Sequence, residues 1–211
     1  ARLLTVETDE LDRDEYARND EYRCYHCKSA MLEQATAVAR REGLAHVLLG
    51  TNADDLGDHR PGHRAAREQG ARHPLLEAGL TKADVRALSQ HLGLPTWNKA
   101  EMACLASRIP YGFRVTRARL GQVEALEEFL KDHGFSQVRV RHHGSVARIE
   151  VPADDLPRLL DPTLRDAAVA AGRDAGFKYV SLDLVGYRRG AMNEGRALPT
   201  GADEQTATPD P

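Results

Sequence analysis

The stretch AHVLLGTNADD at residues 45–55 decides the fold class. Its first six residues form a near-continuous apolar run, which predicts a strand buried on both faces, as in a parallel sheet. The small residues Gly50, Thr51 and Asn52 follow at the end of this strand, where α/β sheets bind ligands. We therefore expect a parallel-sheet α/β domain with a ligand-binding loop directly after the strand.

Three carboxylates follow in the same loop: Asp54, Asp55 and Asp58. Carboxylate oxygens are the ligands that Mg²⁺ prefers in proteins, so this loop is a candidate magnesium site. The alternative is a loop and helix-cap cluster that solvates the end of the strand. The polar stretch continues to residue 74, which is longer than an ordinary loop, so it is expected to be functional or to contain a short helix.

The first hundred residues alternate between strand and helix signals. Residues 3–7 form a β-like run, apolar positions recur at helical spacing over 28–43, and Thr81 caps a helix that Gly93 ends. Strand–helix–strand–loop–helix is an α/β pattern. Two parallel strands cannot make a self-sufficient sheet, so we expect further strands from a longer parent chain or from a partner.

A second unit is expected from about residue 111. Residues 116–134 predict a helix, residues 137–141 and 146–151 predict strands, 154–176 are mostly helical, and 178–185 predict a last strand. This order indicates a small α+β domain with its helices on one face of the sheet. The predicted domains are therefore 1–110, a partial parallel-sheet domain, and 111–190, an α+β domain, with a disordered tail over 191–211.

Composition excludes several function classes. The 211 residues are 41% hydrophobic and 29% charged, and the net charge of −3 provides no broad basic field, so nucleic acid is not an expected partner. No apolar run reaches the length of a membrane helix, and the N-terminus lacks the form of a signal peptide. Three cysteines are too few for a disulfide framework, so we expect cytosolic thiols and a cytoplasmic protein.

The motif RCYHCK at residues 23–28 is the sharpest chemical signal. Two thiols at this spacing can share a metal or cluster, or form a redox disulfide. Cys104 is the only other cysteine, and two close cysteines with a distant third suit a [4Fe–4S] cluster with one iron free of protein ligand. A zinc site completed by a histidine and three unrelated free thiols are the alternatives.

Several arginines are candidates for binding an anion. Arg108 follows Cys104 closely, and Arg139 and Arg141 lie on the same face of one predicted strand because strand side chains alternate. Two neighbouring guanidinium groups favour a phosphate or carboxylate ligand, and the alternative is an exposed sheet face that pairs with Glu150. The chain contains neither GxxxxGK[ST] nor GxGxxG, so neither a P-loop kinase fold nor a dinucleotide site is supported.

Several motifs in order resemble one family: CYHCK at 24–28, GTNADDLGDHRPG at 50–62, the stretch 81–112, VRVRHH at 138–143 and ARIEV at 147–151. Together they resemble the LarE-type ATP-dependent sacrificial sulfur transferases. This family belongs to the PP-loop (N-type ATP pyrophosphatase) superfamily, whose domain is adenine nucleotide alpha hydrolase-like. The resemblance covers about residues 1–192.

The resemblance implies an activity. Family members use ATP to adenylate a carboxylate of pyridinium-3,5-biscarboxylic acid mononucleotide, and sulfur then displaces AMP to leave a thiocarboxylate. This reaction belongs to the synthesis of the nickel-pincer nucleotide cofactor of lactate racemase. In one branch a single cysteine gives up its sulfur, and in the other three cysteines hold a [4Fe–4S] cluster that presents an extra sulfide.

The resemblance also assigns roles to residues of this chain. It implies ATP and Mg²⁺ as cofactors, a nucleotide-type small-molecule substrate, a homo-oligomer, and a sulfur donor or cofactor-maturation proteins as possible partners. The implied roles are catalytic for Cys104 and Glu127, substrate- or phosphate-binding for Arg108, Arg139 and Arg141, nucleotide-binding for Gly50, Thr51, Asn52, Asp58 and Arg60, and cluster-binding for Cys24, Cys27 and Cys104.

One departure from the family pattern is serious. The family's ATP signature Ser-Gly-Gly-x-Asp-Ser is absent from these residues. We therefore expect the chain to lack about the first third of the nucleotide-binding domain and to bind ATP poorly. Two alternatives stay open: a PP-loop [4Fe–4S] tRNA thiolase, and a truncated iron–sulfur or zinc module without catalysis.

Overall fold

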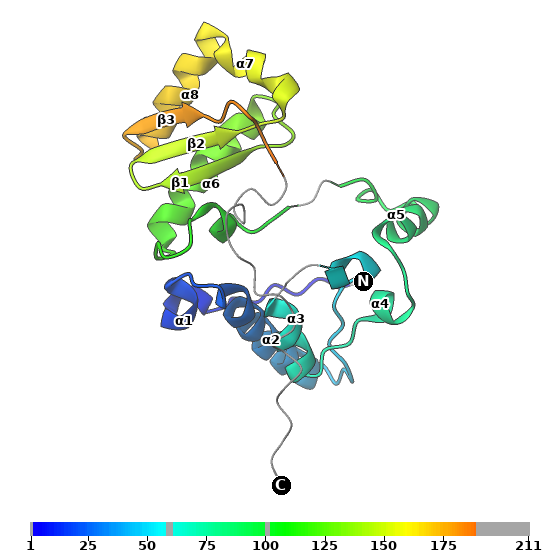
Figure 1. The fold of residues 1–211 in the computed structure, drawn as a ribbon. Coiled ribbons are helices and arrows are strands. Elements are labelled where there is room, and N and C mark those ends of the chain that lie inside the picture. Colours follow the sequence, from blue (N-terminus) through cyan, green and yellow to red (C-terminus); the bar gives the residue numbers. More distant parts are fainter. Residues whose placement is uncertain (1, 58–60, 100–101, 189–211) are drawn as a thin grey trace.

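The computed structural model describes residues 2–57, 61–99 and 102–188 and combines helices with one three-stranded sheet (Figure 1). The predicted mixed α/β class is confirmed at this level. The expected disordered tail at 191–211 lies outside the described residues, as do Asp58 and Arg60. None of the helices in the described ranges has the length and apolarity needed to span a membrane.

Short and long helices make up the first part of the chain. α2 is the longest of the helices described, and its start at Arg23 places Cys24 and Cys27 in its first two turns. The helical segments are η1 (Glu10–Asp12), α1 (Asp14–Ala17), α2 (Arg23–Arg41), η2 (Ala53–Gly57), α3 (Pro61–Glu68), α4 (Pro74–Glu77) and α5 (Lys82–His91).

The predicted helix signals are confirmed. α2 ends before Gly43, which adopts a positive φ of 67° that suits glycine. α5 begins with a capping box, in which Thr81 accepts from the Asp84 backbone N–H and the Asp84 carboxylate accepts from that of Thr81. The long polar stretch after residue 50 contains the helices η2 and α3, so the expectation of a short helix in this stretch is confirmed.

The predicted strand at 45–50 is wrong. Only Leu48 forms an isolated parallel bridge, to Arg72, and its side chain is 58% exposed. An apolar run becomes a doubly buried strand only between neighbouring strands, and the described residues place a single bridging residue beside it. Residues 3–7 likewise form no strand, because no pairing segment lies beside them in the described chain.

The second part of the chain has the predicted order helix–strand–strand–helix–strand. Pro157 and Pro162 lie in the first turns of α7 and α8, where a missing N–H costs nothing, and the helical stretch is interrupted at Asp161, directly before Pro162. The elements are η3 (Leu105–Arg108), α6 (Arg117–Asp132), β1 (Arg139–His143), β2 (Val146–Glu150), η4 (Ala153–Asp155), α7 (Leu156–Leu160), α8 (Pro162–Asp174) and β3 (Tyr179–Leu182).

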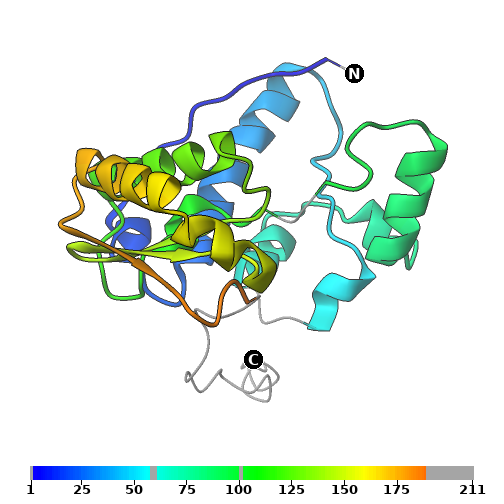
Figure 2. The ribbon, with the colours of Figure 1, turned by 90° about the horizontal axis from the view of Figure 1, so that it is seen from above.

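The sheet has the order β1-β2-β3, with β1 antiparallel and β3 parallel to β2. One face carries the buried residues Val140, Ala147 and Ile149, and α6 and α8 lie on that side (Figure 2). The opposite face carries charged side chains. The helices therefore cover one face of the sheet, as predicted.

The hydrophobic core of the sheet unit continues into earlier parts of the chain. Tyr16 of α1 and Ala106 of η3 belong to the same buried cluster as Leu126, Val140 and Phe177. In contrast, α5 lies far from the sheet in both views and contributes no buried residue (Figures 1 and 2). The domain boundary at residue 110 stays a prediction.

Candidate functional site

The three cysteines come from two segments that are far apart in the sequence. Cys24 and Cys27 are three residues apart on α2, so they lie on the same side of the helix. Cys104 immediately precedes η3. Cys24 and Cys104 are exposed, whereas Cys27 is partly buried and packs against the hydrophobic core.

The thiols lie within electrostatic reach of one another. Burial raises the pKa of the Cys27 thiol to about 11, and the neighbouring Cys104, Glu10 and Cys24 contribute in the same direction. Burial also raises the pKa of the Tyr16 hydroxyl, with further contributions from Cys27 and Cys104. Arg23, the first residue of α2, also donates to the Ala106 carbonyl oxygen at 2.9 Å, so the segment that follows Cys104 contacts the start of the helix that carries the other two cysteines.

Arg108 fixes the segment that carries Cys104. Its Nη1 donates to the carbonyl oxygens of Ala103 and Cys104, at 2.8 and 2.9 Å, and to Ser107 Oγ at 3.0 Å. Its Nε and Nη2 donate to the two carboxylate oxygens of Glu127, at 2.8 and 3.1 Å. Both side chains are buried. The hydrogen bonds of the Arg108 guanidinium described above all go to groups of the protein itself.

Glu127 lies on the buried face of α6, not on a solvated surface. Besides Arg108, its Oε1 accepts the backbone N–H of Val140 at 3.0 Å. Lys131 lies 3.8 Å from its other oxygen. The carboxylate thus joins α6, β1 and η3, and its predicted catalytic role stays a prediction.

Arg139 and Arg141 do lie on the same face of β1. Arg141 donates to both oxygens of Glu150, at 3.0 and 3.1 Å, and to the Ser107 carbonyl oxygen at 3.0 Å. Arg139 stacks over Tyr187, and burial, followed by the charge of Arg108, lowers its pKa. The pairing with Glu150 is therefore present, but it is buried and not on an exposed face.

Comparison with known proteins decides the family. The chain is 40% identical over 194 residues to the pyridinium-3,5-bisthiocarboxylic acid mononucleotide synthase of Lactiplantibacillus plantarum, which covers 92% of this chain and 70% of that protein. The chain belongs to this synthase family. No protein-family model matches the chain.

Two uncharacterised proteins are also similar to the chain. One, from Synechocystis, is 42% identical over 188 residues, covering 89% of this chain and 70% of that protein. The other, from Methanocaldococcus jannaschii, is 31% identical over 175 residues, covering 83% and 68%. The predicted family resemblance is confirmed at the level of the synthase family, while the PP-loop detail and the iron–sulfur branch stay predictions.

The loop that follows residue 50, which the family resemblance assigns to nucleotide binding, forms hydrogen bonds within itself. Asn52 donates its backbone N–H to Asp55, and its side-chain oxygen accepts from the Asp54 backbone. The Asp54 carboxylate accepts the backbone N–H of Lys82, at the start of α5. These hydrogen bonds order the loop and the start of α5. Asp58, the third carboxylate of the candidate magnesium site, lies outside the described residues, so the magnesium site and its alternative both stay predictions.

The three thiols fit an iron–sulfur cluster by their chemistry. Within the described ranges no group of three or more His, Cys, Asp or Glu side chains is placed to hold a single metal ion. A cluster spreads its ligands further apart, because each cysteine binds a different iron. Thiols that converge from α2 and from the segment before η3 are the donor set that such a cluster takes.

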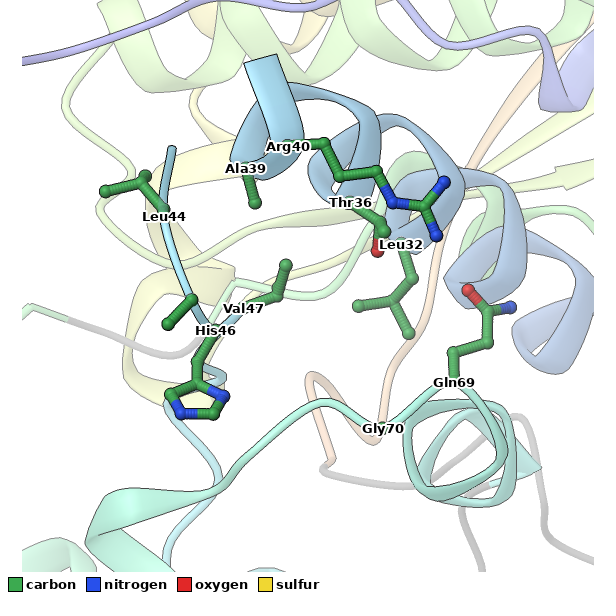
Figure 3. A pocket seen from close by; sticks show the side chains of 10 residues that line it. Leu32, Thr36, Ala39, Arg40, Leu44, His46, Val47, Gln69 and Gly70 are labelled. Atoms are coloured by element: carbon green, nitrogen blue, oxygen red, sulfur yellow. The ribbon is translucent and has the colours of Figure 1, made fainter. Parts of the chain in front are cut away.

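A separate pocket lies along the second half of α2 (Figure 3). Its volume is about 170 Å³, and Leu32, Thr36 and Arg40 line one wall while Val47 and Gln69 face them. A shallower depression beside it shares Thr36, Arg40 and Gln69. None of the predicted site residues within the described ranges lines either one.

Sequence reasoning missed two residues at the thiol site: Asn19 and Arg23. Both are buried, and they connect α2 to the segment after Cys104. Arg23 is adjacent to Cys24 in the RCYHCK motif, and this position next to a candidate cluster ligand is the signal that could have identified it. Nothing in the sequence, however, indicated that this arginine is buried.

Proposed function

We propose that the chain catalyses ATP-dependent sulfur transfer to a carboxylate of pyridinium-3,5-biscarboxylic acid mononucleotide, with a thiocarboxylate as product. The membership in the synthase family supports this reaction class. The observation that carries the proposal is the hydrogen bond from Arg23, at the start of α2, to the Ala106 carbonyl oxygen, because it links the segment of Cys104 to the helix of Cys24 and Cys27.

The three cysteines would hold a [4Fe–4S] cluster: Cys24 and Cys27 from α2, and Cys104 from the segment before η3. When bound, the cluster would supply the sulfide that attacks the activated carboxylate. Arg108 holds the carbonyl oxygens of Ala103 and Cys104, so it fixes the backbone that presents the third thiol. Arg108 thus serves as a positioning residue in this proposal.

The charged face of the sheet would bind the phosphate of the substrate. It carries three guanidinium groups, from Arg139, Arg141 and Arg148, against the carboxylates of Glu150 and Asp183. Burial, followed by the charge of Arg108, lowers the pKa of Arg139, and an anion bound beside it would stabilise its charged form. Arg141 contacts Ser107, so this face adjoins the segment of Cys104.

Activation by ATP is needed because a carboxylate is a poor electrophile. Adenylation turns one carboxylate oxygen into a leaving group, pyrophosphate is released, and the incoming sulfur then displaces AMP. The net change replaces one carboxylate oxygen by sulfur, with that oxygen leaving on AMP. The cationic side chains offset the charge that gathers on the phosphates.

Two measurements test the proposal: ATP–pyrophosphate exchange, and product mass spectrometry with sulfide under anaerobic conditions. Because these residues lack the family's ATP signature, we expect weak exchange from them alone, and in a chain that includes that signature we expect exchange that requires the mononucleotide and a thiocarboxylate product. In such a chain, Cys104→Ala should abolish the thiocarboxylate and retain the exchange. Exchange without dependence on the mononucleotide, or loss of both activities in Cys104→Ala, would contradict the proposed roles.

A further inference from the structure

Asn19 links two parts of the chain that are distant in the sequence, and we call the hydrogen bonds of Asn19 and Arg23 described below the staple. It is fully buried, and its Nδ2 donates to the carbonyl oxygens of Pro110 and Phe113 at 2.8 Å, with Ile109 at 3.3 Å. Its backbone carbonyl accepts the N–H of Gly112 at 3.1 Å. Asn19 lies four residues before the start of α2. Its hydrogen bonds therefore hold the segment that follows η3 against the chain that leads into α2.

Arg23 extends this staple toward the thiols. Its Nη1 donates to Asn19 Oδ1 at 2.6 Å and to the carbonyl oxygen of Ala106 at 2.9 Å. Its Nη2 lies 3.9 Å from the sulfur of Cys24, and its guanidinium lies over the ring of Tyr111. One side chain therefore contacts Cys24 and the backbone two residues after Cys104.

The surroundings of Arg23 are unusual for a buried cation. Its side chain is 5% exposed, and no carboxylate in the described part of the chain forms an ion pair with it. A buried guanidinium without a carboxylate is costly unless other groups satisfy it. Here the satisfying groups are an amide oxygen, a carbonyl oxygen and the sulfur of Cys24.

We propose that Arg23 and Asn19 are positioning residues that hold the Cys104 segment against Cys24 at the start of α2. The inference rests on the three-thiol site of the proposed function and deepens it. Neither residue contacts the reacting carboxylate in this account. They act by keeping two separate thiol-bearing segments in register.

The test uses phenylarsine oxide, which forms two arsenic–sulfur bonds with a close pair of thiols and releases one water. In the metal-free, reduced chain with Cys27→Ser, bridging requires that Cys24 and Cys104 lie together. Bridging is followed by intact mass, and thermal unfolding is recorded for every variant. Without bridging in this parent, the three-thiol site of the proposed function fails, whatever Arg23 does.

Two variants remove the staple in different ways. Arg23→Gln removes the guanidinium, and Asn19→Gly removes the amide without strain because glycine accepts the φ of 61° at this position. We expect each to slow bridging about tenfold, the factor for losing a hydrogen bond to a charged group. Arg18→Gln, which removes an exposed arginine paired with Asp20, should bridge at the parent rate.

Arg23→Lys separates positioning from folding. Lysine keeps the charge but cannot span Asn19, Ala106 and the sulfur at once, so we expect bridging between the rates of the parent and of Arg23→Gln. A folded Arg23→Gln that bridges at the parent rate would overturn the inference. If Arg23→Gln does not fold, unchanged bridging in both Asn19→Gly and Arg23→Lys would overturn it equally.

Discussion

Arg108 and Glu127 form a buried ion pair that holds the segment of Cys104 in place. Glu127 accepts from Arg108 and from the Val140 backbone, and Arg108 in turn holds the backbone around Cys104. Glu127 is 1% exposed and Arg108 is 2% exposed. At this burial, removing one partner leaves the other as an uncompensated charge.

Glu127→Gln is therefore expected to lower the free energy of unfolding by about 3 kcal/mol or more. Glu128→Gln is the matched control, because Glu128 is the next residue on α6 and is exposed. It should change stability by less than about 0.5 kcal/mol. Equal stability of the two variants in urea unfolding would show that the buried pair does not hold the structure.

His142 is a second residue whose state affects stability. It lies on the helix-covered face of β1, accepts the Gly144 backbone N–H at Nδ1, and contacts Gln122 through Nε2. Burial, followed by the charge of Arg119, lowers the pKa of His142. The folded chain therefore favours the neutral imidazole.

This lowered pKa predicts the sign of a pH dependence. The unfolded chain binds a proton at His142 below a pH of about 6.5, whereas the folded chain resists it, so stability falls as the pH drops through that value. His142→Gln removes the imidazole that takes up this proton. The free energy of unfolding of this variant should therefore fall less between pH 7 and pH 5 than that of the parent. Equal losses in urea unfolding would contradict the assignment.

At the scale of elements, α8 packs closely on β3 and α6 at Gly172. A Cβ at this position would lie 2.4 Å from Val180 Cγ2 and 3.5 Å from Leu126 Cδ2. Such a contact forces the branched valine or the helix to move. Glycine thus permits the close approach of α8 to the sheet.

Gly172→Ala is expected to destabilise the chain by about 1–2 kcal/mol, since overpacking costs up to about 3 kcal/mol and the gain in helix propensity returns about 1 kcal/mol. Gly121→Ala in α6 is the control, because a Cβ there meets nothing within 4 Å. It should raise the melting temperature. A rise for both variants would contradict the close packing of α8.

The elements that the sequence predicts correctly are those with strong local signals. α5 has its capping Thr81, α6 its apolar periodicity, and β1 its alternation of valine and arginine. The segment at 45–50 has an equally clear apolar pattern, yet strand formation depends on neighbours that a local pattern does not contain. The same reason explains why residues 3–7 form no strand.

At the scale of the whole molecule, the candidate site is assembled from segments that no local pattern connects. The sequence predicts that the three cysteines share one site and that Arg139 and Arg141 lie on one face of a strand. It also offers pairing with Glu150 as the alternative to a bound anion. It does not predict that Glu127 is buried against Arg108, or that Asn19 and Arg23 link α2 to the segment after Cys104. Burial and long-range pairing are properties of the folded chain alone.

We propose that the cysteines of α2 and the cysteine before η3 form one sulfur-handling site. The most direct measurement is the content of iron, acid-labile sulfide and zinc per chain after purification without oxygen. We expect about four irons with matching sulfide per chain, as a [4Fe–4S] cluster contains, and their loss in both Cys24→Ala and Cys104→Ala. Zinc in place of iron, or iron that survives in Cys104→Ala, would contradict it.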